Sequence, residues 1–569
     1  MSINTQKYIE TFLKIKTKDG QIVPLKLNEP QLKCYEVIKQ QYKQKKPIRI
    51  IILKARQMGF STLTEAIIFK NTATSQNVSS GIVAHIEEAT SNLFNMSNLF
   101  YQELPEKIKP KVRQSNAKEL IFDDKDKNKK GLRSKIKCMT AGGKGIGRSD
   151  TFQNLHISEY AFWPGDKKST LAGLLQAVPD TLNTMVIIES TANGYDDFKK
   201  RWDDAVEGKS DYYPLFCAWH ELKSYRKNAD GIILSQKEKE LKSLYNLDNE
   251  QIAWRRWKIA NDCGGDEDVF MQEFPSCPEE AFLSSGNSVF DKGLIIKQIE
   301  KIKELKPFSK GYFEYKKEVI DISNYKITNI KWIKDEQGYI TIHTPPERYF
   351  DSKGNLTKYA PYVIGVDISG VGSDYNAGKV VNNITKSTCA TLHIQSLNED
   401  LLADQLYCLG KYYNDALIGV ETNYSILTNR ELEKLNYPNL YYREKFDSAS
   451  FNHIRVKGFE TNQKTRPLMI GELTKLLRED ITRECDKTTL KECLSFVKNS
   501  LGRPEAENGS HDDLVIARAI CTLIGEQQEQ TYINLKVEDS TLPFALQTEN
   551  NIENEENDDF FDSMFFEKN

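Results

Sequence analysis

Two short apolar runs that each end in a carboxylate constrain the fold of the second half of the chain. Residues 362–366 lead into Asp367, and residues 416–420 lead in the same way into Glu421. Continuous apolar runs of this length are typical of strands that are buried on both faces of a sheet. Neighbouring parallel strands would bring both carboxylates to one sheet edge. A third acidic element, residues 511–513, begins an amphipathic helix and is expected at the same edge.

This arrangement predicts a nuclease that depends on divalent cations. Carboxylates that converge at one place repel each other unless cations lie between them. We therefore expect two Mg²⁺ or Mn²⁺ ions that activate water and stabilise the leaving oxygen in phosphodiester cleavage. The expected ligands are Asp367, Glu421, Asp512 and Asp513, with Asp374 as an accessory ligand. Helical phase does not decide between Asp512 and Asp513, and an Asp at a helix start also serves as a cap.

Contacts to DNA are expected beside this cluster. Residues 458–467 include Thr461, Lys464 and Arg466, and these side chains suit DNA phosphates near the metal ions. His511 is a further candidate for a phosphate contact. A solvated hairpin and a helix cap are the ordinary alternatives for these two segments.

The first third of the chain carries a different buried run, at residues 48–53, which is followed by a glycine-containing turn and a helix. Similar runs at residues 81–84, 152–157 and 185–189 alternate with helical or loop segments, and this predicts an α/β domain. A turn between a buried strand and a helix points backbone amides and the helix N-terminus at an anion. The expected phosphate-binding loop consists of Lys54, Arg56, Gln57, Met58, Gly59, Phe60, Ser61 and Thr62.

The loop departs from the usual pattern at Phe60, where a Lys normally meets the β- and γ-phosphates. Either Lys54 or Arg56 supplies this charge, or the site is inactive. Ser61 falls at the position whose hydroxyl holds Mg²⁺. A plain strand–turn–helix without a ligand is the alternative interpretation.

Other segments favour ATP hydrolysis. The apolar strand around residues 155–157 continues through Ser158 to Glu159, the place for a carboxylate that orients the attacking water. The Gln31 amide suits an adenine edge, and Arg148 suits an arginine finger that reaches a neighbouring subunit. After the next strand comes a small polar cluster suited to sensing a γ-phosphate: Ser190, Thr191, Ala192 and Asn193. The ordinary alternatives are a solvated acid for Glu159, a turn for residues 190–193 and a surface arginine for Arg148.

Bulk composition excludes several classes of protein. A net charge of -3 gives no global basic field, so DNA contacts depend on local patches, of which the Lys-rich run at residues 125–137 is a candidate. The 10 cysteines occur singly, which argues against a zinc ribbon and predicts reduced thiols in an intracellular protein. No apolar run reaches the length of a membrane span.

Pattern changes along the chain predict an ATPase domain at residues 1–220, a helical linker or lid at 221–310, a second α/β domain at 311–530 and a tail at 531–569. Helices are expected at residues 236–245 and 250–261. The tail is acidic and contains several phenylalanines, so we expect it to be disordered alone, with docking on a capsid or portal protein as the alternative.

Together, these motifs resemble those of the large terminase subunit of tailed bacteriophages or prophages, over roughly residues 25–525. The resemblance rests on their order and spacing. Some terminases carry the essential Lys at the start of the loop, which favours Lys54, whereas Ser158 stands where the family commonly has Asp. The matching segments are the R-Q-x-G-x-S-T loop, Glu159-x-Ala161-x-Trp163, residues 190–194, residues 273–282, Gly-Val-Asp at Asp367, Glu421, residues 458–467 and His511-Asp512-Asp513.

The resemblance implies an N-terminal P-loop ATPase domain of the additional-strand, RecA-like type, a helical linker and a C-terminal RNase H-like nuclease domain. It implies ATP with Mg²⁺ at the first site and two Mg²⁺ or Mn²⁺ ions at the second. ATP hydrolysis would drive viral double-stranded DNA through the portal into a procapsid, and the endonuclease would cut concatemers at initiation and termination. The implied partners are the portal protein, a small terminase subunit and further copies in a homo-oligomeric ring, expected to be a pentamer, in the host bacterial cytoplasm.

Two alternative functions stay open. A helicase–nuclease of DNA repair or defence would need a second ATPase core. A non-catalytic DNA-binding module with a decayed ATP site would explain Phe60.

Overall fold

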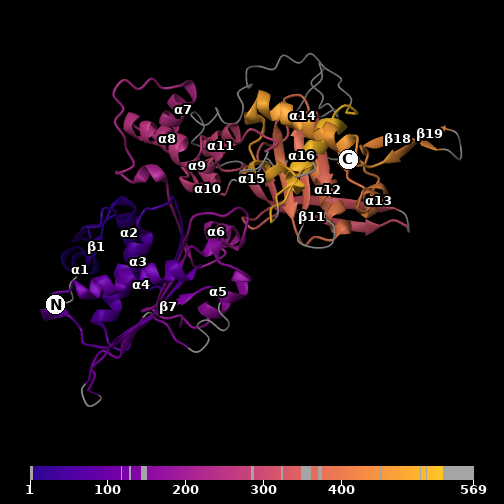
Figure 1. Ribbon diagram of the computed structural model, residues 1–569. Helices are drawn as coiled ribbons and strands as arrows, with labels where there is room; N and C mark the ends of the chain where they lie inside the picture. Colours follow the sequence, from indigo (N-terminus) through magenta and orange to yellow (C-terminus); the bar gives the residue numbers. More distant parts are fainter. Residues whose placement is uncertain are drawn as a thin grey trace, which may run out of the picture. The chain divides into compact units, whose positions relative to one another are not determined.

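The computed structural model divides the chain into two compact units, Met1–Ser285 and Gly286–Asn569, which are described separately (Figure 1). The described residues are 4–116, 118–126, 130–142, 150–282, 288–321, 324–347, 361–368, 375–447, 452–499, 502–507 and 509–528. The predicted tail therefore lies outside the described residues. Within the described ranges, no helix has the length and apolar character that a membrane crossing requires.

The first unit is built on an eight-stranded sheet with the order β10-β3-β9-β8-β4-β7-β6-β5. Neighbours from β10 to β7 are parallel, and β6 and β5 extend the sheet in the antiparallel sense. The predicted parallel α/β domain is therefore present. The strands are β3 (Ile48–Lys54), β4 (Ser79–Ala84), β5 (Val112–Ser115), β6 (Glu119–Phe122), β7 (Ser134–Thr140), β8 (Asn154–Ser158), β9 (Met185–Ser190) and β10 (Tyr213–Cys217), beside a separate pair, β1 (Lys14–Lys16) and β2 (Ile22–Pro24).

Helices cover both faces of this sheet, because alternate residues of its central strands are apolar on both sides. In β3, Ile50 and Ile52 belong to the core beneath the first group of helices, and Ile51 and Leu53 belong to the core beneath the second. The first group comprises α1 (Thr5–Phe12), α2 (Glu29–Lys43), α3 (Phe60–Thr74) and α4 (Glu87–Gln102), and the second comprises α5 (Lys167–Leu175) and α6 (Asp197–Val206). Short 3₁₀ turns occur at η1 (Glu106–Ile108), η2 (Tyr160–Phe162) and η3 (Trp219–Glu221).

A helical segment completes the first unit. It comprises α7 (Gln236–Tyr245), α8 (Asn249–Asp262), α9 (Glu267–Glu273) and α10 (Pro278–Ala281), and α7 and α8 lie where helices were predicted. Trp254 of α8 stacks on Trp219 with ring centroids 5.2 Å apart and on Tyr225 at 4.2 Å. Trp219 and Trp254 belong to the same apolar core as α1–α4. Aromatic packing therefore joins this segment to the sheet that carries the predicted ATP loop.

The second unit contains a seven-stranded sheet with the order β12-β11-β13-β16-β15-β14-β17. Strands β14, β15 and β16 form an antiparallel meander, and β17 returns parallel to β14. This is the strand order of the RNase H-like fold that we predicted. The strands are β11 (Ser309–Val319), β12 (Tyr325–Lys334), β13 (Ile340–Ile342), β14 (Tyr362–Asp367), β15 (Asn376–Asn382), β16 (Thr388–Ile394) and β17 (Leu417–Val420).

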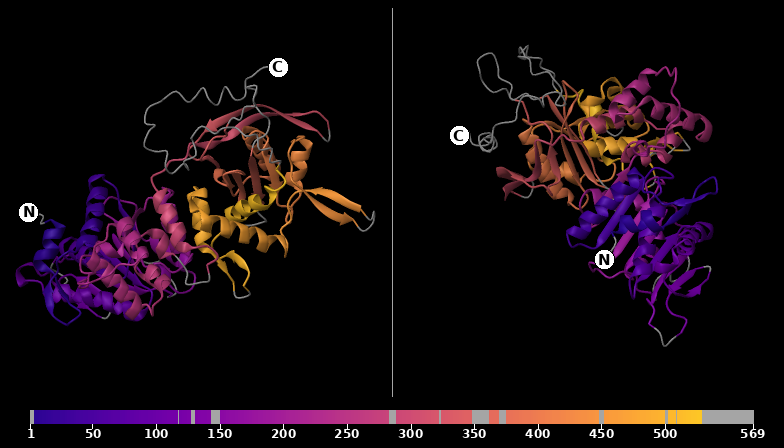
Figure 2. Two further views of the ribbon diagram at one scale, coloured as in Figure 1. Left: turned by 90° about the horizontal axis from the view of Figure 1, so that it is seen from above. Right: turned by 90° about the vertical axis from the view of Figure 1, so that its left-hand side faces the viewer.

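The remaining elements of the second unit pack around this sheet. Strands β18 (Tyr442–Asp447) and β19 (Asn452–Lys457) form a hairpin that projects from the unit (Figure 2). A smaller pair consists of β20 (Phe496–Lys498) and β21 (Pro504–Ala506). The helices are α11 (Lys292–Lys301), α12 (Glu399–Tyr412), α13 (Leu427–Lys434), α14 (Thr465–Glu479), the 3₁₀ turn η4 (Ile481–Arg483), α15 (Lys487–Ser495) and α16 (Asp513–Ile524).

Glycines in β14 and β17 let α16 lie directly against the sheet. A Cβ added at Gly365 would lie 2.2 Å from the carbonyl oxygen of Ala517, and one added at Gly419 would lie 2.9 Å from Ile524 Cγ2. Each glycine stands two residues before an acid of the predicted nuclease site. Because glycine has no side chain, α16, which begins at Asp513, can lie close to the strand that ends in Asp367.

A fully buried lysine joins the central strands to the segment between α14 and α15. Lys379 Nζ of β15 lies 3.2 Å from Asp486 Oδ2 and 3.4 Å from Glu484 Oε1, and it donates to Thr489 Oγ1 at 2.7 Å. Burial lowers the pKa of Lys379, but Asp486 and Glu484 outweigh burial and raise it, so the ammonium stays charged. Removing one partner from such a buried pair costs roughly 3–5 kcal/mol.

We expect Gly365→Ala to destabilise the second unit, because its Cβ would force α16 or β14 to move. The cost of this overpacking should be about 1–3 kcal/mol. Gly471→Ala is the matched control, since Gly471 lies inside α14 with open space around it, and Ala there should stabilise the helix by about 0.5–1 kcal/mol. Chemical denaturation of the full chain measures both, and equal stability changes would contradict the packing argument.

Candidate nucleotide and metal sites

The predicted phosphate loop connects β3 to α3 and is held by Gln31 of α2 and by Asn28, the N-cap of α2. Gly59 has φ 83° and Gln57 has φ 59°, so the chain turns sharply before the helix starts. Asn28 Nδ2 donates to the carbonyl of Met58 at 3.1 Å, and Gln31 Nε2 donates to that of Gly59 at 2.6 Å. The Gln31 amide also accepts from Asn28 N, at 2.9 Å. The structure therefore places Gln31 against the loop, and its contact to adenine stays a prediction.

Other loop side chains are buried or bonded to neighbouring residues. Phe60 and Met58 are fully buried in the core beneath α1–α4, so they offer only backbone groups. Gln57 Oε1 accepts from Lys18 Nζ at 2.6 Å, and Thr62 Oγ1 faces Met96 Sδ at 3.8 Å. Phe60 thus fills a core position where a conventional loop would carry its lysine.

The two candidate cations of the loop have different surroundings. Lys54 is 6% exposed, and its Nζ lies 2.9 Å from Glu159 Oε1 and 3.3 Å from Glu189 Oε2. Burial lowers the pKa of Lys54, but Glu189 and Glu159 outweigh it and raise the pKa, which keeps the ammonium charged. Arg56 instead pairs with Glu273 of α9, Nη2 to Oε1 at 2.9 Å, and its carbonyl accepts from Tyr225 Oη at 2.7 Å. This geometry favours Lys54 over Arg56 as the phosphate-binding cation.

Glu159 follows β8 directly and adopts φ 50°, a left-handed conformation that is uncommon for residues other than glycine. Its Oε2 accepts from Ser190 Oγ at 3.4 Å and from Thr191 N at 3.3 Å. Ser190 Oγ also accepts from Ala161 N at 3.1 Å. The predicted catalytic acid and the predicted coupling segment are therefore in contact.

The remaining coupling residues support the same turn. Asn193 Nδ2 donates to the carbonyl of Ala161 at 3.3 Å, and Ala192 is buried in the core beneath α5 and α6. The proposed arginine finger, Arg148, lies outside the described residues.

Glu189 and His156, which were not predicted as site residues, form a buried charged network below the loop. Glu189 Oε1 accepts from Ser61 Oγ at 2.6 Å and from Ser158 Oγ at 3.0 Å, and it lies 3.3 Å from His156 Nε2. His156 Nδ1 lies 2.8 Å from Glu65 Oε1. Burial lowers the pKa of His156, but Glu189 and Glu65 outweigh it and raise the pKa to about 9.

The pKa of Glu189 is shifted by the same network. Burial raises it, but Lys54, His156 and the Ser61 hydroxyl outweigh burial and lower the pKa below its usual range. The sequence signal was a Glu that immediately follows the apolar residues 185–188, at a position where a buried parallel strand normally carries apolar side chains.

Asp367 and Glu421 lie at one edge of the sheet, and Asp513 and Asp512 are near enough to affect the pKa of Asp367. Val366 and Val420 are partners on the parallel strands β14 and β17, so Asp367 and Glu421 follow them at the same sheet edge. Burial raises the pKa of Asp367 well above its usual range, and the nearby carboxylates of Glu421, Asp513 and Asp512 raise it further. Mutual repulsion of this kind is relieved when divalent cations bind between carboxylates.

Asp512 and Asp513 have different contacts at the start of α16. Asp513 Oδ2 accepts from Tyr375 N at 3.1 Å and lies 3.7 Å from His511 Nδ1. Asp512 Oδ2 pairs with Arg466 Nη2 at 3.3 Å. Because Asp512 is paired with Arg466, Asp513 is the better candidate for a metal ligand. Asp374 lies outside the described residues.

A further acid, Glu492 of α15, was not predicted. Its Oε2 accepts from Leu514 N at 2.8 Å and from Val515 N at 3.1 Å, so it caps the first turn of α16. Burial and the neighbouring Asp513 raise the pKa of Glu492 well above its usual range. Glu492 thereby supports the helix that presents Asp512 and Asp513.

The predicted DNA-contact residues lie around the same edge. Thr461 N donates to Asn423 Oδ1 at 2.7 Å, close to Glu421, and Lys464 is exposed. Arg466 reaches the acid cluster through Asp512. The His511 ring packs edge-on against Tyr375, with centroids 5.3 Å apart.

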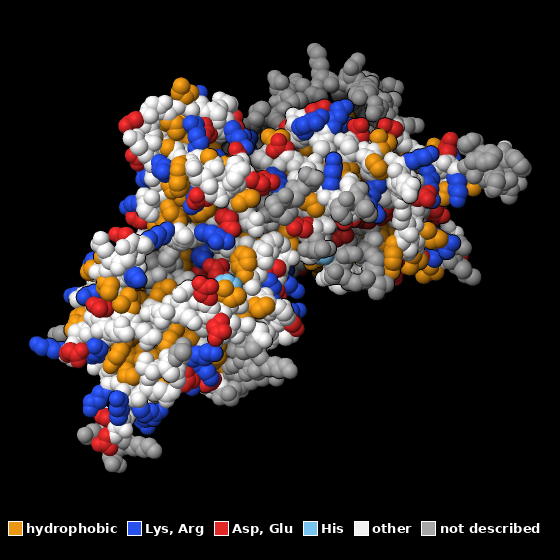
Figure 3. Space-filling view, in the orientation of Figure 1, with side chains coloured by type: hydrophobic (Ala, Val, Ile, Leu, Met, Phe, Trp, Pro, Cys, Tyr) orange, Lys and Arg blue, Asp and Glu red, His pale blue; other side chains and the backbone are white. Residues whose placement is uncertain are grey.

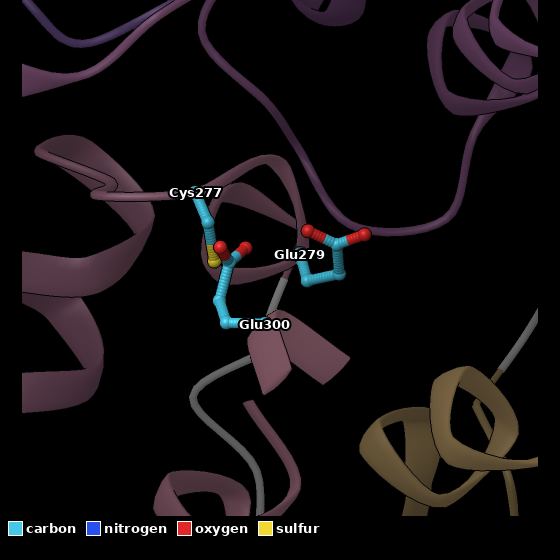
Figure 4. A group of neighbouring side chains, drawn as sticks. All are labelled: Cys277, Glu279 and Glu300. Carbon is cyan, nitrogen blue, oxygen red and sulfur yellow. The ribbon is translucent and has the colours of Figure 1, made fainter. Parts of the chain in front are cut away.

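The Lys-rich run at residues 125–137 has an acidic partner, and its contact with DNA stays a prediction. In the Lys-rich run, Lys135 and Lys137 both pair with Asp150 at 2.8 Å, and Figure 3 shows Asp and Glu among the Lys and Arg side chains at the end of the β5–β7 extension. In the first unit, Cys277 and Glu279 lie at the start of α10 (Figure 4). Burial and the neighbouring Glu280 and Glu279 raise the pKa of Cys277.

Solved structures similar to this chain include large terminases of phages. The large terminase of bacteriophage HK97 is 12% identical, with 92% of this chain and 98% of that chain covered and a TM-score of 0.38. A large terminase from a thermophilic bacteriophage, in complex with ADP, is 11% identical, with 87% and 98% covered and a TM-score of 0.30. The large terminase nuclease of thermophilic phage G20c with bound magnesium is 16% identical, with 43% and 100% covered and a TM-score of 0.28. No protein-family model matches the chain.

We expect Asp367→Asn to raise the melting temperature in EDTA, because it removes one of the mutually repelling charges. Relief of about 1 kcal/mol would raise the midpoint by about 2–4 °C for a unit of this size. Mn²⁺ should raise the melting temperature of the unchanged protein but not of the variant. Calorimetry checks both, with Glu472→Gln, an exposed acid of α14, as the control. An equal Mn²⁺ response in all three proteins would contradict the metal assignment.

Proposed function

We propose that this chain is a large terminase subunit, which couples ATP hydrolysis to the movement of viral double-stranded DNA and cuts that DNA with a metal-dependent endonuclease. The observation that carries the proposal is the presence of two separate polar sites at strand ends in one chain. One contains Lys54, Ser61 and Glu159, and the other contains Asp367, Glu421 and Asp513. The order of their motifs is similar to that in large terminases.

The first site supports ATP hydrolysis by residues of this chain. Lys54 carries a charge that can neutralise phosphates, and Glu159, at the end of β8, can orient the attacking water. Mg²⁺ bound with ATP would neutralise charge on the phosphates, and the Ser61 hydroxyl is its expected ligand. Ser190 and Thr191 touch Glu159, so a shift of Glu159 during the reaction would reach the coupling segment.

The second site supports phosphodiester cleavage. Asp367, Glu421 and Asp513 would hold two Mg²⁺ or Mn²⁺ ions, which activate water and stabilise the leaving oxygen. Arg466, Lys464 and Thr461 would hold the DNA backbone beside them. His511 would contribute a further phosphate contact.

The assembly follows from the same proposal. A homo-oligomeric ring, a pentamer, would act on the portal protein of a procapsid in the host bacterial cytoplasm, and a small terminase subunit would select the viral DNA. A helicase–nuclease would need a second ATPase core, and the described residues contain one parallel sheet with such a loop. The pairing of Lys54 with Glu159 argues against a decayed ATP site.

Substitution of the two loop cations separates their roles. Lys54→Ala should lower ATP turnover about 100-fold or more, because it removes the buried charge that faces Glu159. Arg56→Ala should lower it by less than about tenfold, since Arg56 pairs with Glu273 instead. Phosphate release in the presence of DNA measures both. A larger loss in Arg56→Ala would assign the phosphate charge to Arg56.

The two activities should also separate between the units. Asp367→Ala should abolish DNA cleavage under Mg²⁺ or Mn²⁺ and leave ATP turnover within about twofold of the unchanged protein. Glu159→Ala should have the opposite effect, because it removes the acid that orients water in the other unit. Plasmid cleavage and phosphate release are measured on the same preparations. Persistent cleavage in Asp367→Ala would refute the nuclease assignment.

A further inference from the structure

Glu189 is the acid at the end of β9 that lies nearest to the Ser61 hydroxyl. In the register of the parallel strands β8 and β9, Ser158 and Glu189 are direct partners. Nucleotide sites of this kind hold Mg²⁺ through the loop Ser or Thr together with an acid at the end of a neighbouring strand. Position 158, directly before Glu159, is where that acid is expected, and this chain has a hydroxyl there. Glu189 brings a carboxylate to the same level one strand away.

The contacts of Glu189 match those expected of that acid. Ser61 Oγ donates to Glu189 Oε1 at 2.6 Å, and this donation leaves the lone pairs of the Ser61 oxygen available to a cation. Ser158 Oγ donates to the same oxygen at 3.0 Å. The hydroxyls of Ser61 and Ser158 therefore both donate to one carboxylate oxygen of Glu189.

We propose that Glu189 is a positioning residue for Mg²⁺-ATP: it takes the part of the acid that β8 lacks, by orienting Ser61 as a metal ligand. The inference rests on the proposed ATP site and adds a residue to it. The inference also accounts for Ser158, whose hydroxyl is a second donor to the Glu189 carboxylate.

The surroundings of Glu189 fit this role. Its side chain is fully buried, and Oε2 accepts no hydrogen bond within the described structure, although Lys54 Nζ lies 3.3 Å away. The Oε2 atom of Glu189, which lies on the side of Lys54, therefore has lone pairs that accept no hydrogen bond from the described residues. His156 and Lys54 supply compensating charge, which a buried carboxylate requires. Glu65, the other acid on His156, accepts from Ser97 of α4 instead of from Ser61.

The test compares nucleotide binding with and without Mg²⁺ in the full chain, using a fluorescent ATP analogue. Glu189→Gln keeps the shape of the side chain and removes its charge. We expect the affinity for the Mg²⁺-bound analogue to fall about tenfold or more, as for other residues that orient a metal ligand. The affinity for the analogue in EDTA should not fall. Glu189→Gln removes one anionic partner of Lys54, so the Lys54 ammonium stays available to the phosphates. A general structural defect would lower both affinities.

Glu65→Gln is the matched control, since it also removes a buried carboxylate from His156 but leaves Ser61 and Ser158 unchanged. Its Mg²⁺ dependence should equal that of the unchanged protein. The double variant Ser158→Asp with Glu189→Gln returns a carboxylate to β8 and should recover most of the Mg²⁺-dependent affinity. Should Glu189→Gln not fold, Glu189→Asp serves instead, because it keeps the charge and withdraws it from Ser61.

The outcomes separate this inference from the proposed function. Unchanged Mg²⁺ dependence in Glu189→Gln or Glu189→Asp, with normal binding by the unchanged protein, overturns the role of Glu189 alone. An unchanged protein that binds no nucleotide in either condition overturns the ATP site itself. Loss of Mg²⁺ dependence in Glu65→Gln to the same degree would make the effect a property of the buried network and would also overturn the role of Glu189.

Discussion

Repulsion among carboxylates at the ends of parallel strands is the physical constraint on which both units depend. In the first unit, Glu159 and Glu189 are compensated within the chain, because Lys54 lies between them and His156 lies below. In the second unit, Asp367 and Glu421 lie side by side, and the pKa of Asp367 is raised instead. The acid pair of the first unit, Glu159 and Glu189, is therefore neutralised by a lysine of the chain. The pair of the second unit, Asp367 and Glu421, is suited to metal ions.

Much of this arrangement could be predicted from the sequence because strand ends are local features. Asp367 and Glu421 follow apolar runs, and Glu159 follows another, so their positions at sheet edges needed only the pattern of each run. The helix that begins with Asp513 was recognisable in the same way. The parallel strands of the first unit and the meander of the second were likewise predicted by fold class.

Side-chain partners could not be predicted, because they depend on the register between strands and on distant segments. Glu189 meets Ser158 only because β8 and β9 align them, and Arg56 pairs with Glu273, which lies 217 residues away in the sequence. The bond from the Gln31 amide to the Gly59 carbonyl was likewise not predicted. Each of these contacts depends on the three-dimensional arrangement of whole elements rather than on a local pattern.

Lys379 has a consequence for the order in which the second unit forms during synthesis. Its ammonium lies at the centre of the sheet, and its anionic partners, Glu484 and Asp486, are made about a hundred residues later. Until they emerge from the ribosome, closing the sheet would trap an unpaired charge in an apolar interior. The strand that carries Lys379 therefore gains its anionic partners only when residues 484–486 have been made. A growing polypeptide would accordingly lack the complete cluster of acids until α16, which begins at Asp513, has been made.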